Sequence, residues 1–170
     1  MKKKGLTLVE VIITLAIFSI IVPVIFFFYM SHYKALDKAT VMSDLQLQGE
    51  LSREKITEIF MEGSSIESVI DKEGNDISLM TAPMEISRIT FINGENDIYE
   101  LYMEDELINY LKNENYESKI AECVELMAVN QADSRNVNMK DINIINFHIG
   151  FKEKDLKYEV NFNVNLRNKE

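Results

Sequence analysis

The feature that most constrains this chain is an apolar stretch near its N-terminus. From Val11 to Met30 no side chain carries a charge. As an α-helix rising about 1.5 Å per residue, the stretch covers about 30 Å, which is the thickness of the hydrocarbon core of a bilayer. The sequence therefore predicts a helix that spans a membrane.

The charges that flank this stretch predict its orientation. Three lysines, Lys2 to Lys4, precede it, and the next lysine after it is Lys34. The positive-inside rule then leaves the N-terminus in the cytoplasm and the rest of the chain outside. A secretory signal peptide is the alternative, but it has an apolar core of about 7–15 residues followed by a small-residue cleavage site. Residues 29–34, YMSHYK, offer no such site.

Glu10 stands at the start of the apolar stretch. A carboxylate near the centre of a membrane helix costs about 2.5–3.5 kcal/mol on insertion scales, and less toward an end of the helix. Two explanations fit the sequence at this point. Glu10 either reaches water at the interface like any flanking charge, or it is compensated by a specific partner.

The residues around Glu10 favour the second explanation. The run KGLTLVE at residues 4–10, followed at once by the apolar stretch, resembles the class III signal of type IV prepilins. The resemblance implies that a prepilin peptidase cuts between Gly5 and Leu6, that Leu6 becomes the methylated N-terminus, and that Glu10 is the fifth mature residue. The family more often has Phe at the position of Leu6, and this departure affects only the new terminus.

The resemblance also gives Glu10 a role in assembly. Cleavage creates an α-amino group with a reference pKa of about 7.7–8.0, and Glu10 of an incoming subunit can pair with the amine of the subunit before it. In a low dielectric such a pair is favourable only when both partners are present. The implied partners are the prepilin peptidase, other major and minor pilin subunits, the pilus assembly platform and the membrane.

Two further residues of the N-terminal segment affect the shape of its backbone. Gly5 lacks a Cβ, so an extended backbone can lie in a protease cleft there, although a plain linker glycine is the alternative. Pro23 removes the helix hydrogen bond to the carbonyl of Ser19 and disfavours helical dihedral angles at Val22. A kink at Pro23 is therefore expected, either for assembly or merely because membrane helices tolerate proline.

The pattern from Ser31 to Glu62 is amphipathic. Apolar or small residues recur at intervals of three and four, which is typical of a helix with one buried face. They are Ala35, Ala39, Met42, Leu45, Gly49, Ile56, Ile59 and Phe60. We therefore predict one long helix from about Leu6 to Glu62, ended by the glycine and serines at residues 63–65.

Alternating patterns after the helix predict antiparallel strands. The clearest run, Leu156–Leu166, is apolar at every second residue, and its expected partner is Ile145–Phe151 across a turn at residues 152–155. Ile86–Ile92 and Ile98–Met103 flank a turn signal at residues 93–96, and Leu107–Leu111 continues them as a meander.

The segment between these two groups of strands is ambiguous. Residues 120–127 fit a helical turn, but residues 124–129 also fit a strand, and we favour a short turn followed by a strand. Residues 130–138 are polar and unpatterned, so they are expected to form a loop.

Together these patterns predict an α+β fold with an antiparallel sheet packed on the second half of a long helix. The plan is that of the type IV pilin fold, which the resemblance implies. The expected organisation is a leader at residues 1–5, a transmembrane or filament-core helix at 6–30, its amphipathic continuation at 31–62, and a sheet body at 63–170.

The body adds a looser resemblance. The segments at residues 98–102, 107–110 and 121–125, and the closing VNLRN at residues 164–168, resemble minor pilins and pseudopilins of the PilW and GspJ kind. In that kind the protein belongs to a tip or priming complex. The system served could be adhesion, twitching, type II secretion or DNA uptake for competence.

Candidates for chemistry are sparse. The histidines are His32 and His148, neither beside a second ligand type at metal spacing, and Cys123 is the single cysteine. Glu104–Glu106 could hold Ca²⁺, although a solvated turn is the commoner explanation for such an acidic cluster. We therefore expect no enzyme activity, no cofactor and no metal.

Net charge argues against nucleic-acid binding. The chain has 28 acidic against 18 basic residues, a net charge of −10, and loss of the leader would remove three lysines. So acidic a body repels phosphates. Asn161, Asn163 and Asn165 form a neutral polar face that either contacts a neighbour or is simply wet.

The leading interpretation is thus a minor type IV pilin or pseudopilin, found in the cell membrane and at the cell surface after assembly. The first alternative is a membrane-anchored extracellular binding domain that never assembles. The second is an anchored enzyme that uses the acidic turns.

Overall fold

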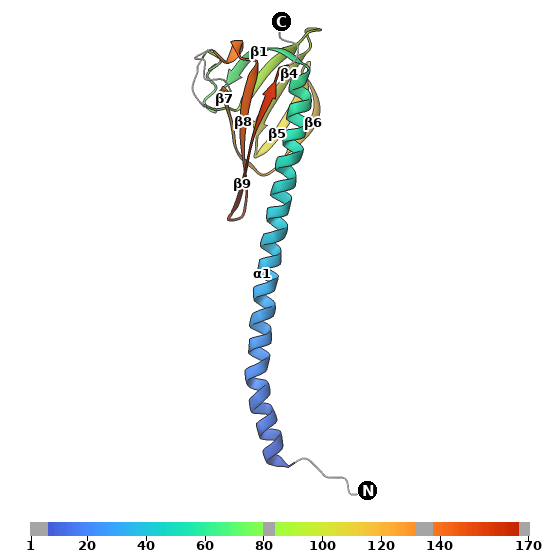
Figure 1. Cartoon of the computed structure of the whole chain (residues 1–170), viewed down its shortest axis with the longest axis vertical. Coiled ribbons are helices and arrows are strands. Elements are labelled where there is room, and N and C mark those ends of the chain that lie inside the picture. The colour runs from blue at the N-terminus through green and yellow to red at the C-terminus, as the bar shows by residue number, and fades with distance from the viewer. Residues whose placement is uncertain (1–6, 80–83, 132–137, 167–170) are drawn as a thin grey trace. The chain divides into compact units, whose positions relative to one another are not determined.

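The computed structural model describes residues 7–79, 84–131 and 138–166. The chain divides into two compact units, residues 1–40 and residues 41–170. Helix α1 (Leu8–Met61) supplies the described structure of the first unit from Leu8 onward and continues into the second. The long helix predicted from the sequence is confirmed, with ends one or two residues inside the predicted ones (Figure 1).

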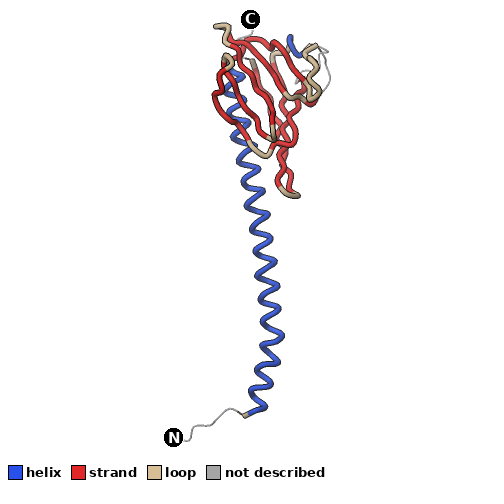
Figure 2. The backbone as a smooth tube through the Cα atoms, turned by 180° about the vertical axis from the view of Figure 1, so that it is seen from behind, coloured by secondary structure: helices blue, strands red, loops and turns tan. Residues whose placement is uncertain are grey.

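The second unit contains two antiparallel sheets. Figure 1 labels most of their strands, and Figure 2 shows them from behind. Sheet A has the order β1 (Gly63–Ile70), β3 (Arg88–Asn93), β4 (Ile98–Glu104), β5 (Leu107–Lys112) and β6 (Asn115–Ala121). Sheet B has the order β2 (Met84–Glu85), β7 (Val124–Gln131), β8 (Ile144–Glu153) and β9 (Leu156–Asn165). A short 3₁₀ helix, η1 (Met139–Asp141), precedes β8.

The part of α1 in the second unit buries one stripe of its surface. The buried residues are Val41, Leu45, Gly49, Ser52, Ile56, Ile59 and Phe60. The stripe recurs at helical spacing, as predicted, but it starts at Val41, and Ala35 and Ala39 are exposed. Burial on α1 therefore begins where the second compact unit begins.

Phe60 joins this helix to both sheets. Its ring centroid lies 4.3 Å from that of Phe91 on β3 and 5.1 Å from that of Phe147 on β8. All three side chains are fully buried, so they form one apolar core between sheet A, sheet B and the last turns of α1.

Gly63 follows the helix at a position where a side chain would clash with its buried neighbours. A Cβ at this position would lie 2.8 Å from side-chain carbons of both Leu166 and Phe91. The predicted helix stop is confirmed, but residues 63–65 are the first residues of β1. The chain thus passes from helix to strand within two residues.

The connection between the two sheets is equally short. β6 ends at Ala121 and β7 begins at Val124, so Glu122 and Cys123 carry the chain from sheet A to sheet B. Cys123 has a φ of 59°. The N–H of Val124 donates to the carbonyl of Glu106 at 2.9 Å, which fixes the crossover to the β4–β5 turn.

Two other contacts hold this crossover. The N–H of Lys152 on β8 donates to the carbonyl of Cys123 at 2.8 Å. The N–H of Glu122 donates to Oε1 of Gln48 on α1 at 3.2 Å. The crossover is therefore bonded to a strand of sheet B and to the helix as well as to sheet A.

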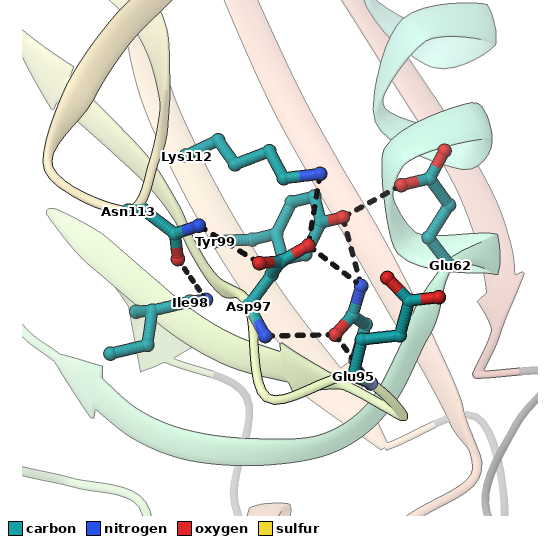
Figure 3. Close-up of polar contacts among 8 residues, drawn as sticks. Glu62, Glu95, Asp97, Ile98, Tyr99, Lys112 and Asn113 are labelled. Atoms are coloured by element: carbon teal, nitrogen blue, oxygen red, sulfur yellow. Dashed lines mark hydrogen bonds and ion pairs between the residues drawn. The ribbon is translucent and has the colours of Figure 1, made fainter.

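A polar network ties the end of α1 to the turns of sheet A (Figure 3). The hydroxyl of Tyr99, a residue only 1% exposed, donates to Oε2 of Glu62 at 2.9 Å and accepts from Nδ2 of Asn93 at 3.1 Å. Asp97 accepts from Nδ2 of Asn113 at 2.9 Å and pairs with Lys112 at 3.0 Å. These bonds, from Asn113 first and Lys112 second, hold the pKa of Asp97 below its ordinary value.

The hairpins at β3–β4 and β8–β9 and the meander through β5 confirm the predicted strands. Three expectations need correction. The strand expected at residues 124–129 is confirmed as β7, but the turn before it is confined to Glu122 and Cys123 and is not helical, because β6 runs to Ala121. Asn130 and Gln131 belong to β7, while the rest of that expected loop up to residue 137 lies outside the described residues.

The third correction concerns the number of sheets. The body has two, because the chain bends at Glu122 and Cys123 and its remaining strands pair separately. In addition, β8 extends to Glu153, so the β8–β9 turn consists of Lys154 and Asp155. The pairings of β1 with β3 and of β2 with β7 depend on tertiary contacts that local patterns do not reveal.

Replacing Gly63 with alanine should destabilise the body. The added Cβ would contact Leu166 and Phe91, and it would lie 3.2 Å from the carbonyl oxygen of Phe60. We expect the free energy of unfolding to fall by about 1–3 kcal/mol, because overpacking forces buried groups apart. Thermal unfolding of the full chain in detergent micelles measures this. Gly94→Ala is the control, since a Cβ there has nothing within 4 Å; equal midpoints for the two variants would contradict the packing.

The hydrogen bonds to Asp97 should make the stability of the body fall at low pH. Because folding lowers the pKa of Asp97 from its ordinary value of 3.8, its stabilisation is present above that value and is lost as the pH falls through the folded-state pKa. Asp97→Asn should therefore flatten the fall in melting temperature below about pH 4. Glu95→Gln, on the same turn, is the control, and a curve unchanged by Asp97→Asn would refute the prediction.

Candidate functional site

The start of α1 is built by a reciprocal pair of hydrogen bonds. Thr7 immediately precedes the helix, and its hydroxyl accepts from the N–H of Glu10 at 3.3 Å. In return, Oε2 of Glu10 accepts from the N–H of Thr7 at 2.8 Å. This is the capping box, in which a threonine and a glutamate three residues later satisfy each other's free backbone donors.

The carboxylate of Glu10 is bound on one side. The Thr7 hydroxyl also donates to Oε2 at 2.9 Å, so both hydrogen bonds that Thr7 donates end at the same oxygen. Within residues 7–79, 84–131 and 138–166, Oε1 of Glu10 accepts no hydrogen bond. The arrangement fixes the orientation of the carboxylate and leaves one oxygen for a donor that the described residues do not supply.

The helix surface around Glu10 is apolar. Every residue from Leu8 to Met30 is exposed, including Phe26, Phe27 and Phe28 at 64%, 76% and 65%. By length and composition α1 could cross a membrane. Exposed apolar area on this scale is unfavourable in water, so lipid or other protein must cover it.

Pro23 lies within α1, and the helix is assigned without interruption through it. Its expected effect on the helix direction stays a prediction. Gly5 and Leu6, where the cut is expected, lie outside the described residues. The structure therefore brings Glu10 together with Thr7 and does not place the other processing residues.

Thr7 is a site residue that the sequence analysis does not predict. Its signal was available, since a threonine followed three residues later by a glutamate before an apolar run is the capping-box pattern. The resemblance gives the same glutamate a role in pairing between subunits, and that role does not involve Thr7.

The body offers little chemistry among its described residues. No group of three or more potential metal ligands occurs there. His148 lies on the outer face of β8, with its Nε2 3.2 Å from Oε2 of Glu159. Burial, aided by Glu153 and two further acidic residues, raises the pKa of the Cys123 thiol, which disfavours the reactive thiolate. Asp105 and Glu106 form an exposed turn, and Glu104 is the exposed last residue of β4.

Comparisons with known proteins bear on the N-terminal segment. A family model described as the prokaryotic N-terminal methylation motif matches residues 1–22. No curated protein and no solved structure matches the chain. The motif and the apolar helix together support a type IV pilin-like precursor that is processed, anchored in the membrane and assembled at the cell surface.

Proposed function

We propose that this chain is a minor type IV pilin or pseudopilin. Prepilin peptidase removes residues 1–5, and α1 then holds the protein in the membrane with the body outside until the subunit enters a filament. The methylation motif at residues 1–22 supports processing, and the loose resemblance of the body to the PilW and GspJ kind supports a place in a tip or priming complex. The work is structural and not catalytic.

The observation that carries the proposal is the half-bound carboxylate of Glu10. Thr7 holds Oε2, so the charge is already partly compensated at the start of the helix while Oε1 stays open. A protonated α-amino group of the preceding subunit could donate to Oε1 without displacing Thr7. Glu10 would then fix the axial position at which each new subunit joins.

A membrane-anchored binding domain that never assembles is the second candidate. The capping box favours it as much as the first, because a glutamate that only caps its own helix needs no neighbour. The two candidates therefore differ in whether the charge of Glu10 matters or only its hydrogen bonds.

Mass spectrometry of the N-terminus tests processing. We expect the native protein to begin at Leu6 with a methylated amine. A chain that still begins at Met1, or one cut after Ser31, would favour the anchored domain and exclude assembly through the proposed amine.

Substitutions of Glu10 separate the charge from the cap. Glutamine at this position can still cap the helix, but it cannot form an ion pair. If pairing is the role, Glu10→Gln and Glu10→Ala should both reduce incorporation into filaments by a factor of roughly a hundred to a few thousand, because removing one partner of a buried pair costs about 3–5 kcal/mol. Immunoblots of sheared filaments against whole cells measure this. Wild-type incorporation of Glu10→Gln would leave capping as the whole role of Glu10.

Thr7→Ala provides the converse test. It removes the cap hydroxyl and keeps the charge, so we expect α1 to fray at its start, with a loss of about 0.5–2 kcal/mol in helix stability. Hydrogen exchange of residues 7–12 in detergent micelles measures this. Thr14→Ala is the matched control, because the Thr14 hydroxyl donates to the Glu10 carbonyl inside the helix at 2.7 Å. Equal exchange in the two variants would show that the capping box contributes nothing.

A deletion strain tests the place in the filament. A tip or priming subunit should change the number of filaments, and tagged protein should be found at filament ends. Even labelling along the whole filament would contradict the tip role while leaving processing and assembly intact.

A further inference from the structure

The free edge of β9 differs from the other sheet edges of the body. β9 pairs with β8 over ten residues, from Leu156 to Asn165, without a register shift. It contains neither proline nor glycine, and among the described residues only β8 pairs with it, so that β9 ends the order of sheet B (Figure 1). Long, regular and unbulged edges are templates on which a further strand can pair.

The remaining edges are short, irregular or covered. β2 has two residues. The pairing of β6 with β5 contains two register shifts, and so does that of β1 with β3. The edge of β1 is also partly covered, because the N–H of Ile77 donates to the carbonyl of Val69 at 2.8 Å. Bulges and covering loops are the usual means by which proteins block edge pairing.

One hydrogen bond at the end of β9 shows which of its backbone N–H and C=O groups face the free edge. The N–H of Leu166 donates to the carbonyl of Asn143 at 2.9 Å, which makes these two residues a hydrogen-bonded pair. In an antiparallel ladder such pairs alternate with non-bonded pairs. Val164 and Phe162 therefore point their backbone groups toward β8, while Asn163 and Asn161 point theirs toward the free edge.

A groove runs beside this edge. It has a volume of about 530 Å³ and is lined by Glu50, Arg53, Glu54 and Thr57 of α1 and by Phe162 and Asn163 of β9. An incoming strand would thus have main-chain partners on β9, and side-chain space against the helix.

Charge around the edge selects the partner. Arg53 is paired with Glu50 at 2.7 Å, and Lys157 is paired with Glu125 at 2.6 Å. Glu54 has no ion pair among the residues that the structure describes. Lys157 shares Glu125 with Lys152. Among the residues that line the groove, Arg53 is balanced by Glu50, so the acidic charge of Glu54 is left over there. A second copy of this chain would bring more acidic charge, so it is the poorer match.

We propose that the β9 edge and its groove bind an extended, basic segment of a different protein by strand addition. Main-chain hydrogen bonds to residues such as Asn161 and Asn163 supply the pairing, and lysine or arginine side chains of the partner face Glu54 and Glu159. The proposal does not depend on assembly through Glu10, because the edge belongs to the body.

Photo-crosslinking in the native cells tests this directly. The full chain carries p-benzoylphenylalanine at Asn161, on the edge strand, and in a matched control at Ala128. Ala128 lies on the same sheet face, in line with His148 and Asn161, but two strands from the edge. We expect the Asn161 probe to link to a basic segment of another protein, identified by mass spectrometry of the linked peptide, and the Ala128 probe to give no such product.

A proline substitution then tests whether backbone hydrogen bonds from β9 hold the partner segment. Asn163→Pro removes an outward N–H without touching the β8–β9 ladder, and edge strands tolerate such prolines. Asn163→Thr removes the same side chain and keeps the N–H. The crosslink should be lost with proline and retained with threonine, while thermal unfolding of both purified chains shows that they fold.

Charge reversal gives a test that does not rely on proline. Glu54→Lys lies on the exposed side of α1, and it should abolish the crosslink if a basic segment is bound. A crosslink to a second copy of this chain, no crosslink at Asn161, or a crosslink that survives both Asn163→Pro and Glu54→Lys would overturn the proposal. Normal processing at Gly5 alongside any of these results would leave the proposed function standing.

Discussion

The body depends on the contact that Phe60 makes with both sheets. One ring at the end of α1 packs against Phe91 of sheet A and Phe147 of sheet B, so neither sheet has a complete core without the helix. Gly63 follows because the chain must turn into β1 beside the same rings. The Tyr99 and Glu62 hydrogen bond adds a polar tie at this point. Packing of the last turns of α1 therefore decides whether the two sheets form one body.

At the other end of the helix, one residue meets two requirements. Glu10 caps the first turn of α1 through Thr7, and the same carboxylate keeps an oxygen for a further donor. Capping lowers the cost of holding a charge at the start of an apolar helix before any partner arrives. A capped carboxylate is also oriented in advance, so a partner amine would meet a fixed acceptor and not a mobile side chain.

Much of this could be predicted from local patterns. The uncharged run, the helical spacing to Phe60 and the strict alternation in β8 and β9 each determine an element by themselves. β6 was not predicted because its sequence, NYESKIA, lacks a regular alternation and pairs with β5 through two register shifts. β1 opens with a glycine and two serines that look like a stop signal. The groove beside β9 has no local signal, because Glu54 and Asn163 are brought together only by the fold.

The short crossover at Glu122 and Cys123 affects how the body unfolds. Its backbone is bonded at once to the β4–β5 turn, to β8 and to Gln48 of α1. Separating the two sheets would break all three contacts and open the core around Phe60 in the same event. The body is thus expected to melt as a single cooperative unit, with no stable half-folded form in which one sheet persists alone.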